Sequence, residues 1–328
     1  MNNLIITRKP RLKKPCLIVA WPGMGEVAFK AAEYLIQELN AKEFARIMPD
    51  EFFYLTGSVI SSGILEVPRL PQGKFYYWKN PALKGSVSRS DLVIFLSNAQ
   101  PDLSKADVYA KSILALAKDL KVDSVASFAS MPQATDHTQE PGVWFAATDQ
   151  KTKESLKKYN FAALADGQIS GMNGLFLGIA KKAGLKGFCL LGEIPLYTIQ
   201  IENPKASAAV LAALGKIMNL QINLQPLKDQ AQALETEINK LLEYLKLGNS
   251  GVSGPIGEEE VELIKKTLSQ LTNLPVSVKD KIEKLFEESR RDISRAKELK
   301  VELDKWNVYK EYEDKFLDLF RKNKDKGN

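Results

Sequence analysis

Two glycine-rich stretches of the sequence carry residue types that could bind an anion, and the first of them is WPGMGEVA, residues 21–28. It stands between the apolar run CLIVA and a helical pattern, so it predicts a turn from a strand into a helix. N–H groups at a helix N-terminus attract phosphate, and glycines let the main chain approach it closely. Gly23, Gly25 and Ala28 also fit the G-x-G-x-x-G/A spacing of a dinucleotide-binding turn.

The same turn has a purely structural interpretation, which the sequence favours. Asp50 lies near the position expected of a ribose-binding acid. It stands between Pro49 and Glu51, however, as in an ordinary polar turn after a strand. The glycines would then serve the close packing of strand and helix. We therefore expect a tight turn here and no bound cofactor.

The second stretch, DGQISGMNG at residues 166–174, predicts another helix start. Gly171 and Gly174 surround Asn173, and Ser170 is the expected N-cap. One interpretation is a capped helix that enters a crowded core. The other is a second anion-facing helix end beside the first, and the sequence leaves both open.

Several polar residues directly follow predicted strands and could converge at one edge of a sheet. In open parallel sheets, ligands bind outside the carboxyl ends of the strands. Gln100 and Asp166 have such positions. If a small molecule binds, we expect it there, and the candidate ligand-binding residues are Gly23, Gly25, Glu26, Asn98, Ser170, Asn173 and Glu193.

The remaining reactive residue types give no catalytic or metal-binding pattern. His137 is the only histidine, and it could act as a base with Asp136, but a single histidine in a polar loop is more often merely exposed. There is no G-x-S-x-G elbow that would supply an activated serine. Cys16 and Cys189 lie in apolar runs as small buried hydrophobes, without zinc-ligand spacing. We expect no catalytic residue and no metal site.

The elements that would position these residues alternate between strand and helix. Apolar runs typical of strands cover 16–20, 43–48, 91–97, 122–130, 143–149, 161–165 and 187–195. Helical spacing covers 25–39, 105–120, 170–184 and 203–220. The aromatic and β-branched stretch between Phe52 and Asn80 indicates antiparallel strands or a β-excursion. The pattern predicts an α/β fold with a three-layer α/β/α core and a mainly parallel sheet.

Length and composition agree with an ordinary globular protein. The chain has 328 residues, 45% of them hydrophobic, and a net charge of +6. It lacks both a long apolar run typical of a membrane helix and the apolar core of a signal peptide, so we expect a cytoplasmic location without a membrane partner. The basic segment RKPRLKK, residues 8–14, is short and has no aromatic interleaving. We therefore expect no nucleic-acid partner.

Beyond residue 220 the pattern becomes helical. It divides the chain into an α/β domain at 1–222 and a helical, coiled-coil-like extension at 223–328, with a flexible linker near 248–257. Helices are expected over 224–245 and 258–271, and residues 274–320 read as one long amphipathic helix. Its aromatic end is the candidate partner-binding surface, formed by Trp306, Tyr309, Tyr312, Phe316 and Phe320.

Two blocks of the sequence together resemble one known family. They are AWPGMGEVAFKAAEYLIQELNAKEFARI, and ADGQISGMNGLFLGIAKKAGLKGFCLLGEIPLY followed by NPKASAAVLAALGKIMNL. Over roughly residues 12–220 the chain resembles the second proteasome assembly chaperone and its prokaryotic relatives. The resemblance implies a core similar to that of nucleoside phosphorylases, self-association, and partners related to the proteasome. The chain ends in KNKDKGN rather than the hydrophobic-Tyr-any tail with which such chaperones often dock, so docking by that route is not expected.

Two hypotheses of different classes follow. The first is a non-enzymatic assembly chaperone or scaffold-like protein, a homo-oligomer that acts through protein–protein contact. The resemblance and the amphipathic extension favour it. The alternative is a small-molecule enzyme of nucleotide or phosphate type that uses the crevice at the strand ends. The two glycine-rich helix starts favour that one.

Overall fold

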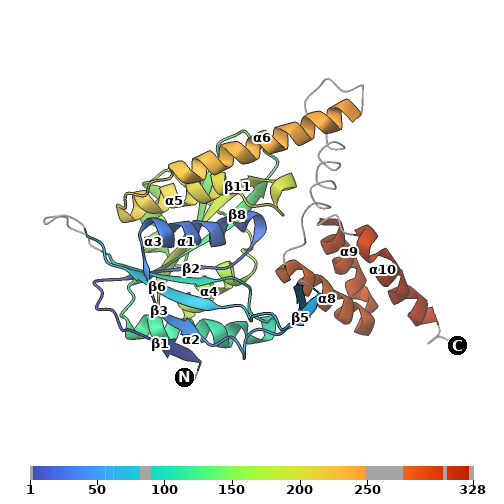
Figure 1. Ribbon diagram of the computed structural model, residues 1–328, viewed down its shortest axis with the longest axis horizontal. Coiled ribbons are helices and arrows are strands. Elements are labelled where there is room, and N and C mark those ends of the chain that lie inside the picture. Colours follow the sequence, from blue (N-terminus) through green and yellow to red (C-terminus); the bar gives the residue numbers. More distant parts are fainter. Residues whose placement is uncertain are drawn as a thin grey trace.

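The computed structural model describes residues 3–55, 57–61, 63–81, 90–248, 276–305 and 309–324 (Figure 1). The strands are β1 (Leu4–Ile6), β2 (Cys16–Ala20), β3 (Lys42–Ile47), β4 (Val59–Ser61), β5 (Ile64–Glu66), β6 (Gly73–Trp78), β7 (Leu92–Ser97), β8 (Ser124–Gln133), β9 (Val143–Ala147), β10 (Ala162–Ala163) and β11 (Lys186–Pro195). The helices up to residue 248 are α1 (Val27–Glu38), α2 (Ala106–Asp119), α3 (Gln150–Lys157), α4 (Met172–Lys182), α5 (Pro204–Met218) and α6 (Gln225–Gly248). Short 3₁₀ turns, η1 (Met24–Glu26), η2 (Leu103–Lys105) and η3 (Leu196–Thr198), precede α1, α2 and α5.

One nine-stranded sheet forms the centre, in the order β1-β3-β6-β7-β2-β8-β11-β9-β10. Its middle block, β7-β2-β8-β11, is parallel. On either side of this block the pairs β6–β7 and β9–β11 are antiparallel. Central parallel strands are covered on both faces, which is why β2 is an unbroken apolar run with all five residues buried.

Helices cover both faces of the sheet. On one face α1 and α5 share a core with Ile18, Ile94 and Leu190, and α6 lies along the outside of α5 (Figure 1). On the other face α2 and α4 pack on Leu17, Phe95 and Leu191. The expected α/β fold class with its three layers is confirmed, and both cysteines are free and buried.

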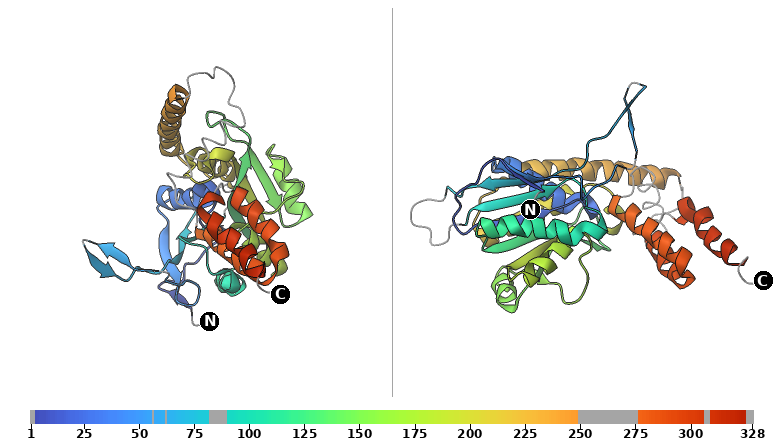
Figure 2. Two further views of the ribbon diagram at one scale, coloured as in Figure 1. Left: turned by 90° about the vertical axis from the view of Figure 1, so that its right-hand side faces the viewer. Right: turned by 90° about the horizontal axis from the view of Figure 1, so that it is seen from below.

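The β-excursion expected between Phe52 and Asn80 is confirmed in a particular form. β6 joins the main sheet antiparallel to β3 and β7. β4 and β5 form a separate two-stranded sheet. Figure 2 shows this hairpin standing away from the body of the molecule in both views.

The prediction of one long helix over 274–320 is wrong. The structure has α8 (Val276–Arg291), the 3₁₀ turn η4 (Ile293–Arg295), α9 (Ala296–Lys305) and α10 (Tyr309–Lys324). The chain leaves the helical conformation at Asp292, with φ −137° and ψ 103°, and the Asp292 carboxylate accepts the N–H of Ser294 at 3.0 Å. A sequence-local N-cap therefore outweighs the continuous apolar spacing. The helix predicted over 258–271 and most of the predicted linker near 248–257 lie outside the described residues.

These three helices form a unit with its own core, called here the C-terminal helical unit (residues 276–324). Its buried residues are Ile282, Leu285, Phe286, Ala296, Leu299, Leu303, Phe316 and Leu319. The apolar stripe that suggested a coiled coil is thus satisfied within the chain, because the helices fold back on one another. From the α/β part, Met24 and Ile199 pack against this core.

In the parts of the chain that the structure describes, no helix has the length and apolar character needed to span a bilayer.

Candidate functional site

The WPGMGEVA turn follows β2 at the carboxyl end of the parallel block. Gly25 has φ +62°, and Glu26 has φ +50°, which is uncommon for a residue with a side chain. The Gly25 N–H donates to the Ile199 carbonyl at 2.8 Å, and the Gly25 carbonyl accepts from the Asn203 N–H at 2.8 Å. The turn is therefore tied on both sides to the segment that follows β11.

The second glycine-rich stretch is joined to the first by side-chain hydrogen bonds. The Asn173 side chain extends the main-chain pattern of β2: its Oδ1 accepts the Trp21 N–H at 3.0 Å, and its Nδ2 donates to the Trp21 carbonyl at 2.9 Å. Asn173 is buried, and a Cβ at Gly23 would lie 3.7 Å from its amide nitrogen. Two stretches about 150 residues apart in the chain thus meet at one sheet edge, since parallel strands end there.

Gln100, which follows β7, makes a similar pair of side-chain hydrogen bonds between the two stretches. Its Nε2 donates to the Pro22 carbonyl at 2.6 Å, and its Oε1 accepts the Met172 N–H at 2.9 Å. Gly171, with φ +72°, is the N-cap residue of α4 and makes no side-chain cap. The expected N-cap Ser170 is therefore wrong. Because Gln100 satisfies the helix start, the exposed Ser170 is not needed for it.

Two other predicted residues have structural partners at neighbouring edges. Asn98 pairs with Gln72, through an Oδ1 that accepts the Gln72 N–H at 2.8 Å. The Glu193 carboxylate accepts the Gly142 N–H at 2.8 Å and the Trp144 indole N–H at 2.7 Å, which fastens β11 to β9. Asp50 and Asp166 make no contact with the glycine-rich turn that the structure records.

Two main-chain N–H groups of the turn already have partners, which bears on the chemistry of the turn. The Gly25 N–H is bonded to Ile199, and the Glu26 N–H donates to the Gly23 carbonyl at 2.9 Å. A phosphate needs such N–H groups free and pointing outward. The geometry therefore supports the structural interpretation of WPGMGEVA rather than a dinucleotide-binding turn.

Glu26 is the one titratable group of this turn in an unusual electrostatic setting. Burial, and after it the Glu202 carboxylate, raise the pKa of Glu26 to about 7 against the opposing effect of Lys30. Lys30 itself forms ion pairs with Glu202 at 3.0 Å and Glu33 at 3.3 Å. Glu26 adjoins Met24, on which the C-terminal helical unit packs. A carboxyl that is half protonated near neutral pH is the feature here that could act as an acid or base.

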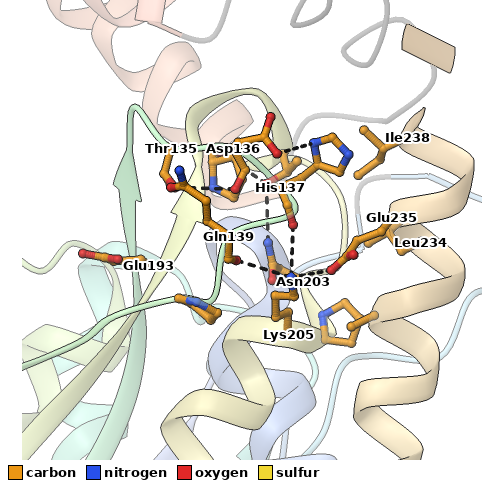
Figure 3. A pocket seen from close by; sticks show the side chains of 15 residues that line it. Thr135, Asp136, His137, Gln139, Glu193, Asn203, Lys205, Leu234, Glu235 and Ile238 are labelled. Atoms are coloured by element: carbon orange, nitrogen blue, oxygen red, sulfur yellow. Dashed lines mark hydrogen bonds and ion pairs between the residues drawn. The ribbon is translucent and has the colours of Figure 1, made fainter. Parts of the chain in front are cut away.

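His137 lies in a small pocket between the β8–β9 loop, the start of α5 and α6 (Figure 3). The expectation of an exposed histidine is wrong, because His137 is only 7% exposed. Its Nδ1 lies 2.8 Å from the Tyr197 hydroxyl, and its Nε2 lies 2.9 Å from Oδ1 of Asn239. The cavity measures about 30 Å³, room for about one water molecule, so it is too small for a substrate.

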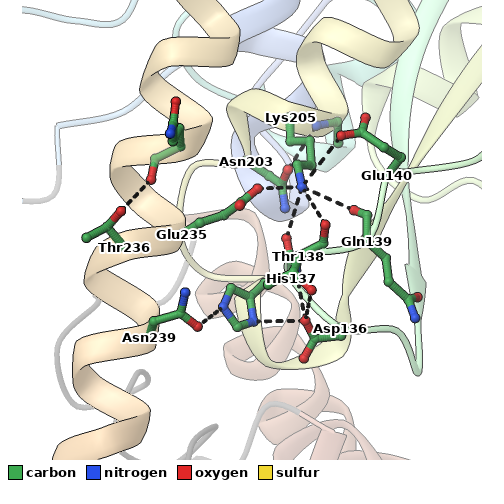
Figure 4. A network of polar contacts seen from close by, with 12 residues as sticks. Asp136, His137, Thr138, Gln139, Glu140, Asn203, Lys205, Glu235, Thr236 and Asn239 are labelled. Atoms are coloured by element: carbon green, nitrogen blue, oxygen red, sulfur yellow. Dashed lines mark hydrogen bonds and ion pairs between the residues drawn. The ribbon is translucent and has the colours of Figure 1, made fainter.

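The side chain of Lys205 extends the polar contacts around His137 into a larger network (Figure 4). The Lys205 ammonium donates to the carbonyls of His137, Thr138 and Gln139, at 3.3, 3.0 and 3.3 Å, and forms an ion pair with Glu235 of α6. Burial raises the pKa of Tyr197 to about 12, so its hydroxyl stays protonated. The cluster therefore fixes α6 and the β8–β9 loop in place, and each group in it already has a partner.

Sequence reasoning missed the residues that brace this edge from the β11 side. The sequence predicts a helix from residue 203 but does not assign its cap. Asn203 N-caps α5 by accepting the Ala206 N–H at 2.9 Å, and the Asn-Pro pair at 203–204 is the signal that could have revealed this role. No local pattern signals the pairing of His137 with Tyr197 and Asn239. Those residues lie 60 and 102 positions away along the chain.

The aromatic residues proposed as a partner surface are mostly inside the C-terminal helical unit. Phe316 is buried between Tyr309 and Phe320, with ring centroids 5.4 and 5.5 Å apart, and Tyr312 stacks on Phe286 at 5.7 Å. Phe320 remains 46% exposed. Trp306 lies outside the described residues. Other exposed apolar side chains of the unit are Ile293 in η4, Val301 in α9 and Leu317 in α10.

The sequence of this chain is similar to known protein sequences. The sequence profile of the PAC2 family matches residues 17–242. The chain is 28% identical over 268 residues to the uncharacterised protein MJ1210 of Methanocaldococcus jannaschii. The match covers 79% of this chain and 97% of that protein.

The chain is also similar to solved protein structures. Pyrococcus furiosus PbaB, described as an archaeal proteasome activator, is 28% identical with a TM-score of 0.62, over 74% of this chain and 99% of that one. P. furiosus PbaA, described as an archaeal homolog of proteasome-assembly chaperone, is 25% identical with a TM-score of 0.55, over 75% and 99%.

Proposed function

The chain belongs to the PAC2 family, and from that premise we propose that it is a non-enzymatic assembly chaperone or scaffold protein with proteasome-related protein partners. The printed descriptions of PbaB and PbaA support the choice of partner. The proposed setting is the cytoplasm. The proposed division keeps an α/β domain at 1–222 and a helical extension at 223–328, of which α6 packs on α5.

One structural observation carries the proposal: the polar residues at the strand ends hold the fold, while apolar residues of the extension face outward. Asn173 and Gln100 use their amides on the main chain of the glycine-rich turn. On the C-terminal helical unit, by contrast, Val301 is 61% exposed and Phe320 46%. Exposed apolar side chains, when they form a contiguous patch, are typical of protein-binding surfaces.

We propose that the outer face of the C-terminal helical unit, with Ile293, Val301, Leu317 and Phe320, is the surface that meets the partner. Of the aromatic residues singled out by the sequence, Phe320 would touch the partner directly. Tyr309, Tyr312 and Phe316 would support it from within the unit. Among the described residues, the apolar contact between the unit and the α/β part rests on Met24 and Ile199, and in this proposal the unit shifts on binding.

The test is a binding and assembly assay with purified proteasome α and β subunits. The full chain should bind an α-subunit species or change the rate at which the ring forms, as followed by size-exclusion chromatography and light scattering. Leu317→Glu/Phe320→Glu should abolish the effect, because charges would enter the proposed interface. Leu175→Glu is the matched control, since Leu175 is 45% exposed but lies on α4. Equal loss in the control, or no effect of the full chain, would contradict the proposal.

A second candidate function keeps one specific observation in its favour. The Glu26 carboxyl has a pKa of about 7 beside a glycine-rich turn, as an acid–base group of a small-molecule enzyme would. In that proposal Gly23, Gly25, Glu26, Asn98, Ser170, Asn173 and Glu193 line a nucleotide or phosphate site at the strand ends. A thermal-shift screen with nucleotides and inorganic phosphate tests it, because a bound ligand raises the melting temperature. A shift that Glu26→Gln removes would favour this function.

A further inference from the structure

The four most exposed large apolar side chains among the described residues lie on or directly after the hairpin formed by β4 and β5. This hairpin is the tip of a segment, residues 54–70, called here the β4–β5 arm. Ile60 is 69% exposed, Leu65 71% and Val67 77%. In the register of the hairpin Ile60 pairs with Leu65, and Val67 directly follows the last residue of β5. Ile64 on the opposite face is 67% exposed, so both faces of the arm offer apolar side chains to a partner.

The base of the arm is firmly anchored. Phe52 and Phe53 are buried against Tyr109 of α2, with ring centroids 4.7 and 5.8 Å apart. The Asp102 N–H donates to the Phe52 carbonyl at 2.9 Å. The direction of the arm is therefore set by the core, and Figure 2 shows it pointing into open space.

The composition of the arm favours a binding partner that buries its exposed side chains and strand edges. An isolated two-stranded hairpin is marginally stable in water, and exposed strand edges without charges invite pairing. Between residues 52 and 72 the sequence contains only two charged residues, Glu66 and Arg69, and their charges cancel. The arm thus presents apolar surface and open strand edges with no net charge.

We propose that the β4–β5 arm is a self-association element that packs across a second copy of this chain. The whole chain has a net charge of +6, so two copies repel one another wherever their basic surfaces meet. The neutral arm lets the copies make contact without bringing those charges together. A strongly acidic or strongly basic partner would meet one attractive and one repulsive charge on the arm, so its net charge would gain nothing.

A receiving surface exists on the same chain, beside the base of the arm. Leu103 in η2 and Val108 in the first turn of α2 are 54% and 48% exposed. Lys105 and the ion pair Asp107–Lys111 lie exposed on the same stretch, so both signs of charge are available for Glu66 and Arg69 of another copy. Donor and receiver on one chain allow a two-fold arrangement in which each copy covers the other.

The first test measures the subunit number of the full chain by light scattering. The wild type should be oligomeric. Ile60→Ser/Leu65→Ser should weaken association by about 100-fold, since two apolar side chains lose their burial. The control is Val301→Ser, which removes an equally exposed apolar side chain from α9. A monomeric wild type, or an arm variant with an unchanged subunit number, would overturn the proposal.

The second test places the arm on its receiver. Chains carrying Leu65→Cys and chains carrying Val108→Cys, with different tags, are mixed and treated with a short bifunctional maleimide. The two native cysteines are buried and should not react. Cross-links between differently tagged chains are expected, and none with Val301→Cys in place of Val108→Cys. Absence of the cross-link would overturn the proposed contact. The inference does not depend on the proteasome-related function, because the proteasome subunits take no part in either experiment.

Discussion

The carboxyl-end turn of the α/β core and the C-terminal helical unit use polar and apolar groups in opposite ways. In the core, the side-chain amides of Asn173 and Gln100 form hydrogen bonds with the main chain around one turn, beside a large cluster of buried apolar side chains. In the helical unit, the recorded ion pairs lie at the surface, as with Arg295 and Glu288, and apolar residues such as Val301 face outward. The core is built to hold its shape, and the unit retains surface that another protein could cover.

The connection between the two regions shows the same contrast. Inside the core, helices and strands share two extensive clusters of buried side chains. Between core and unit, Met24 and Ile199 make the apolar contact in the part of the chain that the structure describes. Each buried apolar side chain contributes about 1.5–3 kcal/mol, so this contact is small next to either interior. We therefore expect the two regions to respond separately to substitution.

Replacement of Gly25 by a residue with a side chain should lower the stability of the core the most. Gly25 has φ +62°, and a Cβ there would lie 3.2 Å from Cδ1 of Ile194. Gly25→Val should lower the free energy of unfolding by about 4 kcal/mol, from backbone strain and overpacking together. Gly171→Val, at φ +72° and 3.2 Å from Gln100, should act in the same direction. Urea denaturation followed by circular dichroism measures both.

The matched control for these variants is Gly178→Val. A Cβ at Gly178 meets nothing within 4 Å, and Gly178 has no positive φ. It should leave stability within about 1 kcal/mol of the wild type. If Gly25→Val unfolds at the same urea concentration as this control, the turn is not held as the structure indicates.

Removal of the Asn173 amide should have the next largest effect. Asn173→Ala leaves the buried N–H and carbonyl of Trp21 without partners, at a cost of about 2–3 kcal/mol. Asn98→Ala, which loses an exposed contact with Gln72, is the control and should cost under about 1 kcal/mol. Equal losses in the two variants would mean that the hydrogen bonds of Asn173 add nothing specific.

The pH dependence of stability offers a smaller effect at the junction of the two regions. The pKa of Glu26 rises from 4.5 to about 7 on folding, so the folded state binds the proton more tightly. Its contribution is fully present below pH 4.5 and is lost as the pH rises toward 7 and beyond. Because Glu26 is partly exposed and screened, we expect a loss of about 1 kcal/mol across that window.

Glu26→Gln should remove this part of the pH dependence, because the amide does not titrate. Urea denaturation at pH 4.5, 6 and 7.5 compares its slope with that of the wild type and of Glu33→Gln, a neighbouring carboxylate on α1. The wild type and Glu33→Gln should lose stability as the pH rises, and Glu26→Gln should lose less. Parallel slopes for all three proteins would contradict the assignment.

The smallest predicted effect improves the helical unit instead of damaging it. Ser289 is fully buried in α8, and its hydroxyl has no hydrogen-bond partner. Ser289→Ala should stabilise the unit by under about 1 kcal/mol, because a buried unpaired hydroxyl is removed. Hydrogen exchange of α8 and α9 amides should slow, while exchange at β2 and β8 stays as in the wild type. Slower exchange in the core as well would show that the two regions unfold together.

The sequence was a good guide to the core and a poor guide to the helical unit, for physical reasons. Buried parallel strands leave unbroken apolar runs, so β2, β7 and the start of β8 were visible, and the sheet edge then followed from chain direction. The helix break at Asp292 was missed because apolar spacing continues through it. A single capping aspartate decides the local conformation there.

At the candidate site, the sequence located the residues but not their roles. It placed Asn173 near the glycine-rich turn, and the two do meet. It could not show that the amide binds the Trp21 main chain, since orientation depends on contacts between distant segments. The same holds for His137, whose burial by Tyr197 and Asn239 has no local sequence signal.

The most direct test of the account measures amide hydrogen exchange on the full chain, with and without a proteasome α-subunit species. If the helical unit is the partner surface and the core a scaffold, added protection should appear in α9 and α10, around Val301, Leu317 and Phe320. Exchange at the glycine-rich turn of residues 21–28 should stay unchanged. Protection that appears at this turn and leaves α9 and α10 unaffected would contradict the division of roles between the two regions.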